Sequence, residues 1–202
     1  LMALARAGIG RLVIADIDRF DVTNLNRQVF ATLDTVGQTK AGATADALLR
    51  INPDLEITVL GAEWVHEARD CIASAAVVVN GTDDLAAALL LYRTAREAGK
   101  TVVDAYAAPL PSVYVTRCDD PAHEARLGYP TIGVAWDRLT SDLRSASFRK
   151  EIEWVMIHSS SSRHIDLAVV AEVVAGRRPR MSFAPMVITT GQLMAYEVIN
   201  AV

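Results

Sequence analysis

The apolar and polar positions along the first half of the chain predict strands and helices in alternation. Short runs of apolar, largely β-branched residues predict strands over 11–15, 55–60, 75–79, 101–105 and 112–116. Apolar residues that recur three or four positions apart predict helices over 39–49, over 65–73 and from about 85 to 98. The run 75–79 is continuous, as in a strand buried on both faces. Alternation of this kind is typical of a parallel sheet with crossover helices.

The pattern weakens beyond Arg117. Residues 118–165 are rich in Asp, Ser and Arg and predict turns with one or two short helices, whereas 165–175 and 185–202 predict helices again. No stretch has the composition of a linker, so we expect a single α/β domain over 1–202, with an irregular insertion at about 118–165 and a C-terminal helix.

The start of the chain indicates a segment upstream. Residues 1–7 resemble the last two turns of a helix, closed by Gly8 and Gly10, and they lack the features of a signal peptide. In nucleotide-binding α/β units, an acidic residue that ends the second strand accepts hydrogen bonds from ribose, roughly 20 residues after a Gly-rich loop. Asp16 ends the strand 11–15, which places that loop before Leu1. The alternative is that Asp16 only caps a loop.

Composition and charge exclude several classes of protein. The chain has 202 residues, 51% hydrophobic and 22% charged, which excludes intrinsic disorder. A net charge of −4 gives no support to a nucleic-acid surface, and apolar runs such as 86–91 are far too short to span a membrane. Two cysteines, Cys71 and Cys118, form neither a disulfide framework nor a four-cysteine zinc site. We therefore expect a reducing, cytoplasmic location.

Five polar or glycine-containing blocks follow one another at characteristic spacing. They read DIDRFDVTNLNRQ (16–28), VGQTK (36–40), INP (51–53), NGTDD (80–84) and GQLMAYE (191–197). They closely resemble the ThiF/MoeB/HesA family, the bacterial branch of the ubiquitin-activating-enzyme superfamily, whose pattern is D-x-D, S-N-L-x-R-Q, V-G-x-x-K, I-N-P, D-x-T-D-N and G-S-L-Q-A-x-E. Thr23 replaces the usual Ser, and Asp84 stands where Asn is usual. The resemblance covers about 1–106 and 183–202.

The resemblance implies a Rossmann-like, mostly parallel sheet flanked by helices. It also implies an enzyme that uses ATP and Mg²⁺ to adenylate a C-terminal carboxylate, that of a small ubiquitin-like sulfur-carrier protein. Such a reaction places negative charge on phosphate oxygens, so the site needs cations and fixed donors.

Each candidate site residue suits one part of that chemistry. Arg27 offers a planar fork of donors, Lys40 a mobile charge in the first turn of a helix, and Asn24 a neutral donor beside them. Asp83 follows a buried strand, where the resemblance implies that it holds Mg²⁺. We therefore expect Arg27, Lys40 and Asp83 to be catalytic and Asp16, Asn24, Arg27 and Lys40 to bind ATP. Asp18 and Gln28 also match the motif, with less direct roles.

The chain departs from the family at its cysteines. Many members bind zinc through two C-x-x-C pairs, which are absent here, and the four histidines lack ligand spacing, so we expect no zinc. Thioester-forming members carry a cysteine after the core strands. Cys118 lies there, but the carboxylates of Asp119 and Asp120 oppose the formation of a thiolate. We expect Cys118 not to be a nucleophile and Cys71 to lie in the core.

Several alternatives stay open at this point. The resemblance implies a homodimer, in which an arginine of the partner, upstream of Leu1, completes the ATP site. The substrate could instead be a peptide terminus or an Asn side chain, or the chain could be a catalytically silent partner subunit. An NAD-dependent oxidoreductase fits the fold but gives Arg27 and Lys40 no role. Taken singly, Asn24 and Asn26 could be turn residues, and Arg27 and Lys40 solvated charges.

Overall fold

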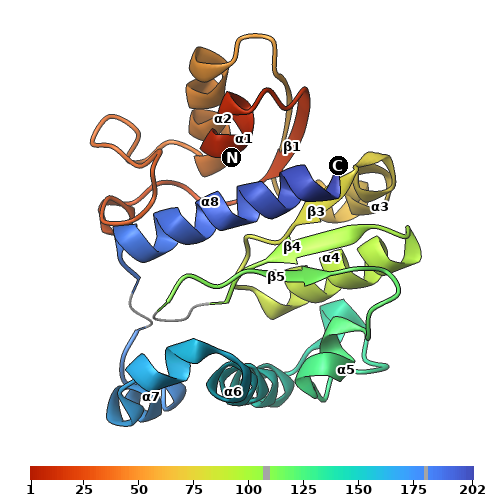
Figure 1. The fold of residues 1–202 in the computed structure, drawn as a ribbon, viewed down its shortest axis with the longest axis vertical. Helices are drawn as coiled ribbons and strands as arrows, with labels where there is room; N and C mark the ends of the chain where they lie inside the picture. The colour runs from red at the N-terminus through yellow and green to blue at the C-terminus, as the bar shows by residue number, and fades with distance from the viewer. Residues whose placement is uncertain (107–109, 180–181) are drawn as a thin grey trace.

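The computed structural model describes residues 1–106, 110–179 and 182–202, arranged as Figure 1 shows. The elements in chain order are α1 (Met2–Arg6), β1 (Arg11–Ala15), η1 (Val22–Asn24), α2 (Lys40–Ile51), β2 (Glu56–Leu60), α3 (Trp64–Ser74), β3 (Val77–Val79), α4 (Leu85–Glu97), β4 (Thr101–Asp104), β5 (Tyr114–Thr116), α5 (His123–Leu127), η2 (Trp136–Arg138), α6 (Ser141–His158), η3 (Ser160–His164), α7 (Leu167–Val174) and α8 (Ala184–Ala201), where η marks a 3-10 helix. The strands and helices expected before residue 117 are confirmed.

The strands form two sheets in the described part of the chain. β1 and β2 pair in parallel, with Leu12 opposite Ile57. β3 and β4 also pair in parallel, while β5 runs antiparallel to β4, in the order β3-β4-β5. Two of these three strand pairs are parallel and each is joined by a crossover helix. The mostly parallel α/β architecture is therefore confirmed.

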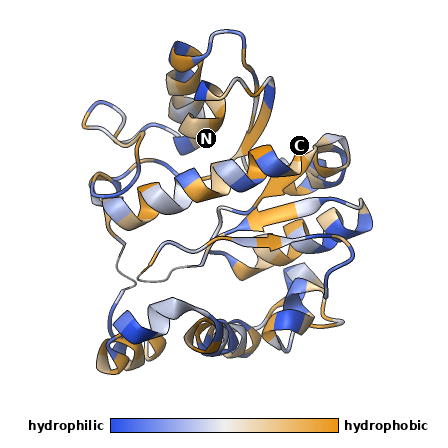
Figure 2. Cartoon of the chain, viewed as in Figure 1, coloured by the Kyte–Doolittle hydropathy of each residue, from blue (hydrophilic) through white to orange (hydrophobic). Residues whose placement is uncertain are grey.

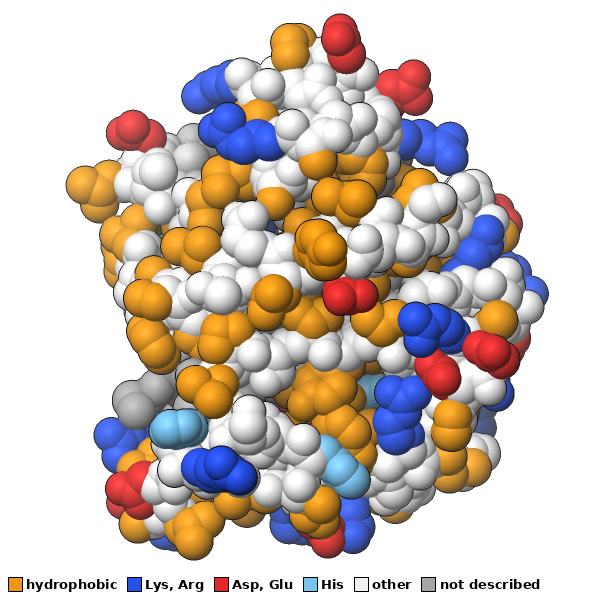
Figure 3. All heavy atoms as spheres, in the orientation of Figure 1, with side chains coloured by type: hydrophobic (Ala, Val, Ile, Leu, Met, Phe, Trp, Pro, Cys, Tyr) orange, Lys and Arg blue, Asp and Glu red, His pale blue; other side chains and the backbone are white. Residues whose placement is uncertain are grey.

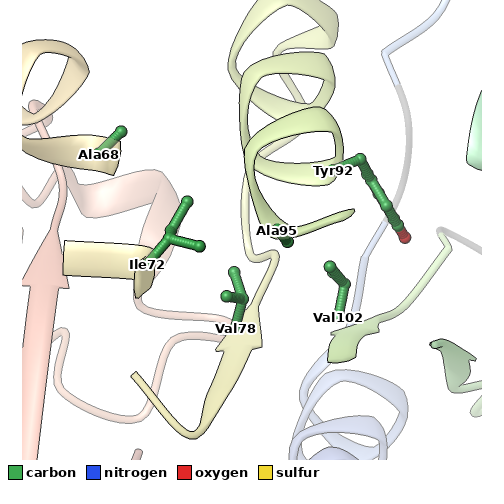
Figure 4. Close-up of a cluster of buried hydrophobic side chains, with 6 residues drawn as sticks. All are labelled: Ala68, Ile72, Val78, Tyr92, Ala95 and Val102. Atoms are coloured by element: carbon green, nitrogen blue, oxygen red, sulfur yellow. The ribbon is translucent and has the colours of Figure 1, made fainter. Parts of the chain in front are cut away.

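The three-stranded sheet is covered on both faces because side chains alternate along its strands. Val78 of β3 and Val102 of β4 pack with residues of α3 and α4, as Figure 4 shows. Val103, the next residue of β4, packs instead against Ala195 and Val198 of α8. The sheet is thus a layer between α8 on one side and α3 and α4 on the other. Its strands stand out as hydrophobic in Figure 2.

The two-stranded sheet is covered on one face. Ile14 of β1 packs with Ala5 of α1 and Leu48 of α2, and Leu48 is fully buried. Val13 lies on the opposite face and stays 42% exposed. On the covered face, Val59, the register partner of Ile14, is still 43% exposed. Apolar surface is also exposed on the outer side of α8, at Ile188, Leu193, Tyr196 and Ile199. Figure 3 shows hydrophobic side chains along the band where α8 crosses the molecule in Figure 1.

Two sequence-based expectations need correction. The run 75–79 is not a strand buried on both faces: β3 begins at Val77, and Val79 is 43% exposed. The reason is that β3 is the end strand of its sheet. The segment 118–165 holds more than short helices, since α6 runs over 18 residues. Its apolar side chains are spread around the helix rather than gathered on one face, so periodicity did not reveal it.

The insertion is fastened to α4 by polar and aromatic contacts. The guanidinium of Arg93 donates two hydrogen bonds to the carboxylate of Glu124, at 2.8 Å and 2.7 Å. His123 is buried, and its ring stacks on that of Tyr92 with the centroids 3.9 Å apart. Burial, with a smaller effect of the Arg126 charge, lowers the pKa of His123 from 6.5 to about 4. Among the described residues, no helix has the length and apolar character needed to cross a membrane.

Protonation of His123 should destabilise the fold in mild acid. The unfolded chain binds a proton at this histidine more readily than the folded chain does, so its contribution is present above pH 6.5 and is lost as the pH falls toward 4. We expect this residue alone to lower the free energy of unfolding by about 2 kcal/mol between pH 7 and pH 5. Denaturant titration of wild type and His123→Phe at both pH values measures it, with exposed His66→Gln as the control. An equal decrease in wild type and His123→Phe would contradict the assignment.

Candidate functional site

The first group of candidate residues lies where β1 ends and α2 begins. Nζ of Lys40, the first residue of α2, lies 2.8 Å from Oδ2 of Asp18. Oδ1 of Asp16 accepts a hydrogen bond from the backbone N–H of Asp18 at 2.9 Å. The Lys40 side chain is only 16% exposed, while that of Asp18 is 64% exposed. The lysine is thus held in place by a carboxylate that itself faces solvent.

The turn before α2 fixes this arrangement. Gly37 has a φ of 87°, a conformation that favours glycine, and its carbonyl accepts a hydrogen bond from the guanidinium of Arg19 at 2.7 Å. The backbone N–H of Phe20 donates to the carbonyl of Gln38, and that of Lys40 donates to the carbonyl of Asp18, both at 2.9 Å. The expectation that Lys40 lies in the first turn of its helix is confirmed.

The second group, Asn24 and Arg27, is built on the 3-10 turn η1. Asn24 is 7% exposed, and its Oδ1 accepts from the backbone N–H of Asp21 at 3.1 Å. The side chain of Asp21 accepts in return from the N–H of Thr23, which lowers the pKa of Asp21. Arg27 donates through one nitrogen to the carbonyl of Thr23 at 2.6 Å. Asn24 therefore has a structural role in the turn, whatever its amide nitrogen binds.

Most of the Arg27 donors remain available. The nitrogen that bonds Thr23 also donates to Oδ1 of Asn26 at 2.9 Å, while Nε and the other terminal nitrogen have no partner among the described residues. Nδ2 of Asn26 donates to the carbonyl of Ser182 at 3.1 Å, just before α8. This contact joins the segment 16–40 to the start of α8, where Figure 1 shows the two side by side.

The third group is the loop between β3 and α4, which carries Asp83. Oδ1 of Asn80 accepts from the N–H of Thr82 at 3.2 Å, and Oγ1 of Thr82 accepts from the N–H of Asp84 at 3.0 Å. Asp84 then caps α4 by accepting from the N–H of Ala87 at 2.9 Å. Asp83 is exposed and has no hydrogen-bond or ion-pair partner in the described part of the chain. Its position after β3 is as expected.

The structure brings some candidates together and not others. Asp16 and Lys40 belong to one cluster through Asp18, and Asn24 and Arg27 share one turn. No hydrogen bond or ion pair among the described residues joins Asp83 to either pair. None of the five candidates lines the hollow of about 340 Å³ between α1 and α2 or the cavity of about 30 Å³ between α4 and α5.

Sequence reasoning missed three polar residues around the Asp83 loop. Asp84 pairs with Arg144 of α6, with Oδ2 and the guanidinium nitrogen 2.9 Å apart. Asp104 is 5% exposed at the end of β4, and burial raises the pKa of its carboxyl. An acidic residue that ends a strand was a visible signal for Asp104. Nothing in the sequence could reveal the pairing of Arg144, which lies 60 positions from Asp84.

The donors present suit Mg²⁺ bound together with phosphate. Mg²⁺ takes oxygen ligands and is commonly held by one or two carboxylates plus the phosphates of a nucleotide. The free Asp83 carboxylate can supply such a ligand. Among the described residues, no group of three or more His, Cys, Asp or Glu side chains could hold a metal without a nucleotide. Cys118 is exposed, and Cys71 is half-buried rather than in the core, with burial raising the pKa of its thiol.

The sequence as a whole matches one family model. The model of the ThiF family covers residues 1–202. The chain belongs to the ThiF family. Over 84 residues it is 38% identical to the sulfur carrier protein ThiS adenylyltransferase of Escherichia coli K12, a stretch that covers 41% of this chain and 34% of that protein. Over 65 residues it is 43% identical to the tRNA threonylcarbamoyladenosine dehydratase of Bacillus subtilis 168, which covers 32% and 26% of the two chains.

The fold of this ThiF-family chain also resembles solved structures. E. coli MccB, crystallised with AMPCPP and MccA, superposes with a TM-score of 0.62 at 17% identity, covering 98% of this chain and 50% of that one. At this identity the likeness concerns the fold alone. The matched stretches span 34% and 26% of the length of the two curated relatives, and the superposition covers half of MccB.

The Lys40–Asp18 pair, whose Asp18 carboxylate is 64% exposed, should contribute little to the stability of the ThiF-family chain. Ion pairs with a solvent-exposed partner are worth less than about 1 kcal/mol, whereas breaking a buried pair costs several. We expect Asp18→Asn to change the free energy of unfolding by less than about 1 kcal/mol, and Glu124→Gln, which breaks the buried pair with Arg93, to cost about 3 kcal/mol. Denaturant titration compares the two. An equal loss would show that Asp18 serves the fold rather than the position of Lys40.

Proposed function

We propose that the chain is the adenylation unit of an ATP-dependent adenylyltransferase that activates a terminal carboxylate. One observation carries the proposal. In a chain that belongs to the ThiF family, Lys40 opens α2 directly beside Asp16 and Asp18 at the end of β1. The names of relatives support the same reaction, since the E. coli relative is a sulfur carrier protein ThiS adenylyltransferase. MccB was solved with AMPCPP, an analogue of ATP.

The reaction has a simple balance. An oxygen of the substrate carboxylate attacks the α-phosphorus of ATP, the bond from that phosphorus to the bridging oxygen breaks, and pyrophosphate leaves with the electron pair. The products are an acyl adenylate and pyrophosphate. Negative charge grows on the oxygens of the phosphates during the transfer, and the protein must meet it with cations and donors already in place.

The geometry gives each residue a part in that task. Lys40 carries two N–H donors besides the one directed at Asp18. It is also the first residue of α2, and the start of a helix is a common place for an anion to bind. Arg27 offers its unused donors from a turn that Asn24 keeps rigid. One carboxylate oxygen of Asp16 is held by Asp18, and the other is available to the ribose hydroxyls.

Asp83 is the residue that we assign to Mg²⁺. Asp83 is exposed, lies after β3 and has no partner among the described residues. Its carboxylate oxygens are therefore available to coordinate a nucleotide-bound ion. Bound there, Mg²⁺ would neutralise charge on the phosphates of ATP.

We infer that the substrate is the C-terminus of a small ubiquitin-like sulfur-carrier protein. The resemblance of the motif blocks and the name of the E. coli relative support this class. A peptide terminus is the alternative, and mass spectrometry distinguishes them. An adenylate formed from a small protein that ends in Gly-Gly supports the carrier, and one formed only from short peptides contradicts it. A single domain, a homodimer, a cytoplasmic location and the absence of zinc and nucleic-acid binding stay predictions.

Loss of the Asp83 carboxylate should abolish ATP–pyrophosphate exchange. A metal contact contributes several kcal/mol to the transition state, so we expect Asp83→Ala to lower the exchange rate at least about 100-fold while the circular dichroism spectrum stays that of wild type. Asp46→Ala removes another exposed carboxylate, from α2, and should leave the rate within twofold. Unchanged exchange in Asp83→Ala would show that Asp83 is only a loop residue.

Cys118 should be dispensable for adenylation. It is exposed, is followed by two carboxylates and does not lie at the start of a helix, the position at which reactive cysteines are often found. We expect Cys118→Ala to exchange pyrophosphate at nearly the wild-type rate. The protein is also incubated with ATP and a small protein that ends in Gly-Gly, and run on a non-reducing gel. A thiol-sensitive adduct that is lost in Cys118→Ala would place the chain in the thioester-forming branch.

A further inference from the structure

A buried carboxylate–amide pair lies at the carboxyl ends of β3 and β4. Nδ2 of Asn80 donates to Oδ2 of Asp104 at 2.9 Å, and the two residues are 4% and 5% exposed. They lie on neighbouring parallel strands: the backbone N–H of Asn80 donates to the carbonyl of Val103, the residue before Asp104, and so continues the β3–β4 pairing. In open α/β sheets, this edge is where ligands bind.

The Asp104 carboxylate is fully engaged. Besides Asn80, the hydroxyl of Tyr92 donates to Oδ2 at 2.8 Å, and the backbone N–H of Ala105 donates to Oδ1 at 2.6 Å. Three donors compensate for the removal of a charge from water, and an ionised carboxylate can only accept. Figure 4 shows the Tyr92 side chain extending away from Ala68 and Ile72 of the core cluster, with its hydroxyl at the far end.

This arrangement fixes which way the amide of Asn80 faces. Because the backbone N–H of Thr82 can only donate, the carbonyl oxygen of Asn80 faces the loop and its NH₂ group faces Asp104. That oxygen accepts from the N–H of Thr82 at 3.2 Å, and Thr82 in turn holds the N–H of Asp84. The backbone on each side of Asp83 is thereby tied to a buried charge, while the Asp83 carboxylate itself stays free.

We propose that Asn80 and Asp104 are positioning residues that hold the loop 81–84, so that Asp83 presents its carboxylate to a nucleotide-bound divalent cation. The assignment rests on the proposed function for the cation and on geometry alone for the loop. Neither residue touches the nucleotide. Their effect is transmitted through two hydrogen bonds, from Asp104 to Asn80 and from Asn80 to Thr82.

Two uncharged variants separate this role from general loosening of the core. Asn80→Ala removes both hydrogen bonds of the Asn80 side chain. Tyr92→Phe removes a different hydrogen bond to the same oxygen of Asp104 and leaves the loop contact intact. Neither variant adds or removes a charged side chain, and each removes one hydrogen bond to the same oxygen of Asp104, so the comparison isolates the loss of the Asn80–Thr82 contact.

The first measurement is amide hydrogen exchange of Thr82 by NMR, on the whole protein without nucleotide or metal. We expect Asn80→Ala to raise the exchange rate at least about tenfold and Tyr92→Phe to change it less than twofold, because an N–H that loses its acceptor exchanges readily. If Asn80→Ala does not fold, Asp104→Asn takes its place. It keeps an acceptor for the amide but lets the Asn80 side chain rotate, and a rise of severalfold is then expected.

The second measurement is the affinity for Mn²⁺ in the presence of AMPCPP, followed by electron paramagnetic resonance. We expect about tenfold weaker binding in Asn80→Ala and no more than a twofold change in Tyr92→Phe. Faster exchange at Thr82 without weaker Mn²⁺ binding would overturn the proposal, as would equal effects in the two variants. The exchange measurement needs no adenylation, so a failure of the proposed function, seen as no pyrophosphate exchange in wild type, is distinguishable from a failure of the loop contact.

Discussion

The three-stranded sheet is covered on both faces, and this constraint organises the middle of the chain. The residues of β3 and β4 alternate between the layer of α3 and α4 and the layer of α8, so neighbours such as Val102 and Val103 are buried by different helices. Crossover helices follow from the need to return each strand in the same direction. Polar groups are then confined to the ends of the strands, and the candidate chemistry lies there.

The acidic side chains at the strand ends occupy two different environments, one buried and one in contact with solvent. The Asp104 carboxylate is buried and saturated by three donors, so it acts as a fixed anchor for its surroundings. Asp16, Asp18 and Asp83 keep contact with solvent, and Lys40 retains donors beyond its bond to Asp18. The buried groups have hydrogen-bond partners, which fix the positions of the strand ends before a ligand binds. The exposed groups keep unused hydrogen-bonding capacity, which a ligand can use.

Much of this could be predicted from the sequence. Hydrophobic periodicity identified the strands and helices up to residue 116, because each buries one recognisable set of side chains. It failed for α6, whose apolar residues do not lie on one face: Val155 is buried, whereas Ile157, two positions on, is 68% exposed. The V-G-x-x-K block correctly placed Lys40 in the first turn of its helix, but the ion pair of Lys40 with Asp18 was not predicted. Contacts between distant positions, such as Asn80 with Asp104 and Asp84 with Arg144, depend on packing that no local pattern encodes.

The central claim is that this surface binds a magnesium–triphosphate and not a dinucleotide. Calorimetry of the protein with ATP, in the presence and absence of Mg²⁺, and with NADH tests it most directly. The arrangement of Lys40, Arg27 and Asp83 predicts binding of ATP that requires magnesium and is tighter than any binding of NADH. Tighter binding of NADH than of ATP, or binding of ATP that is indifferent to magnesium, would contradict the account.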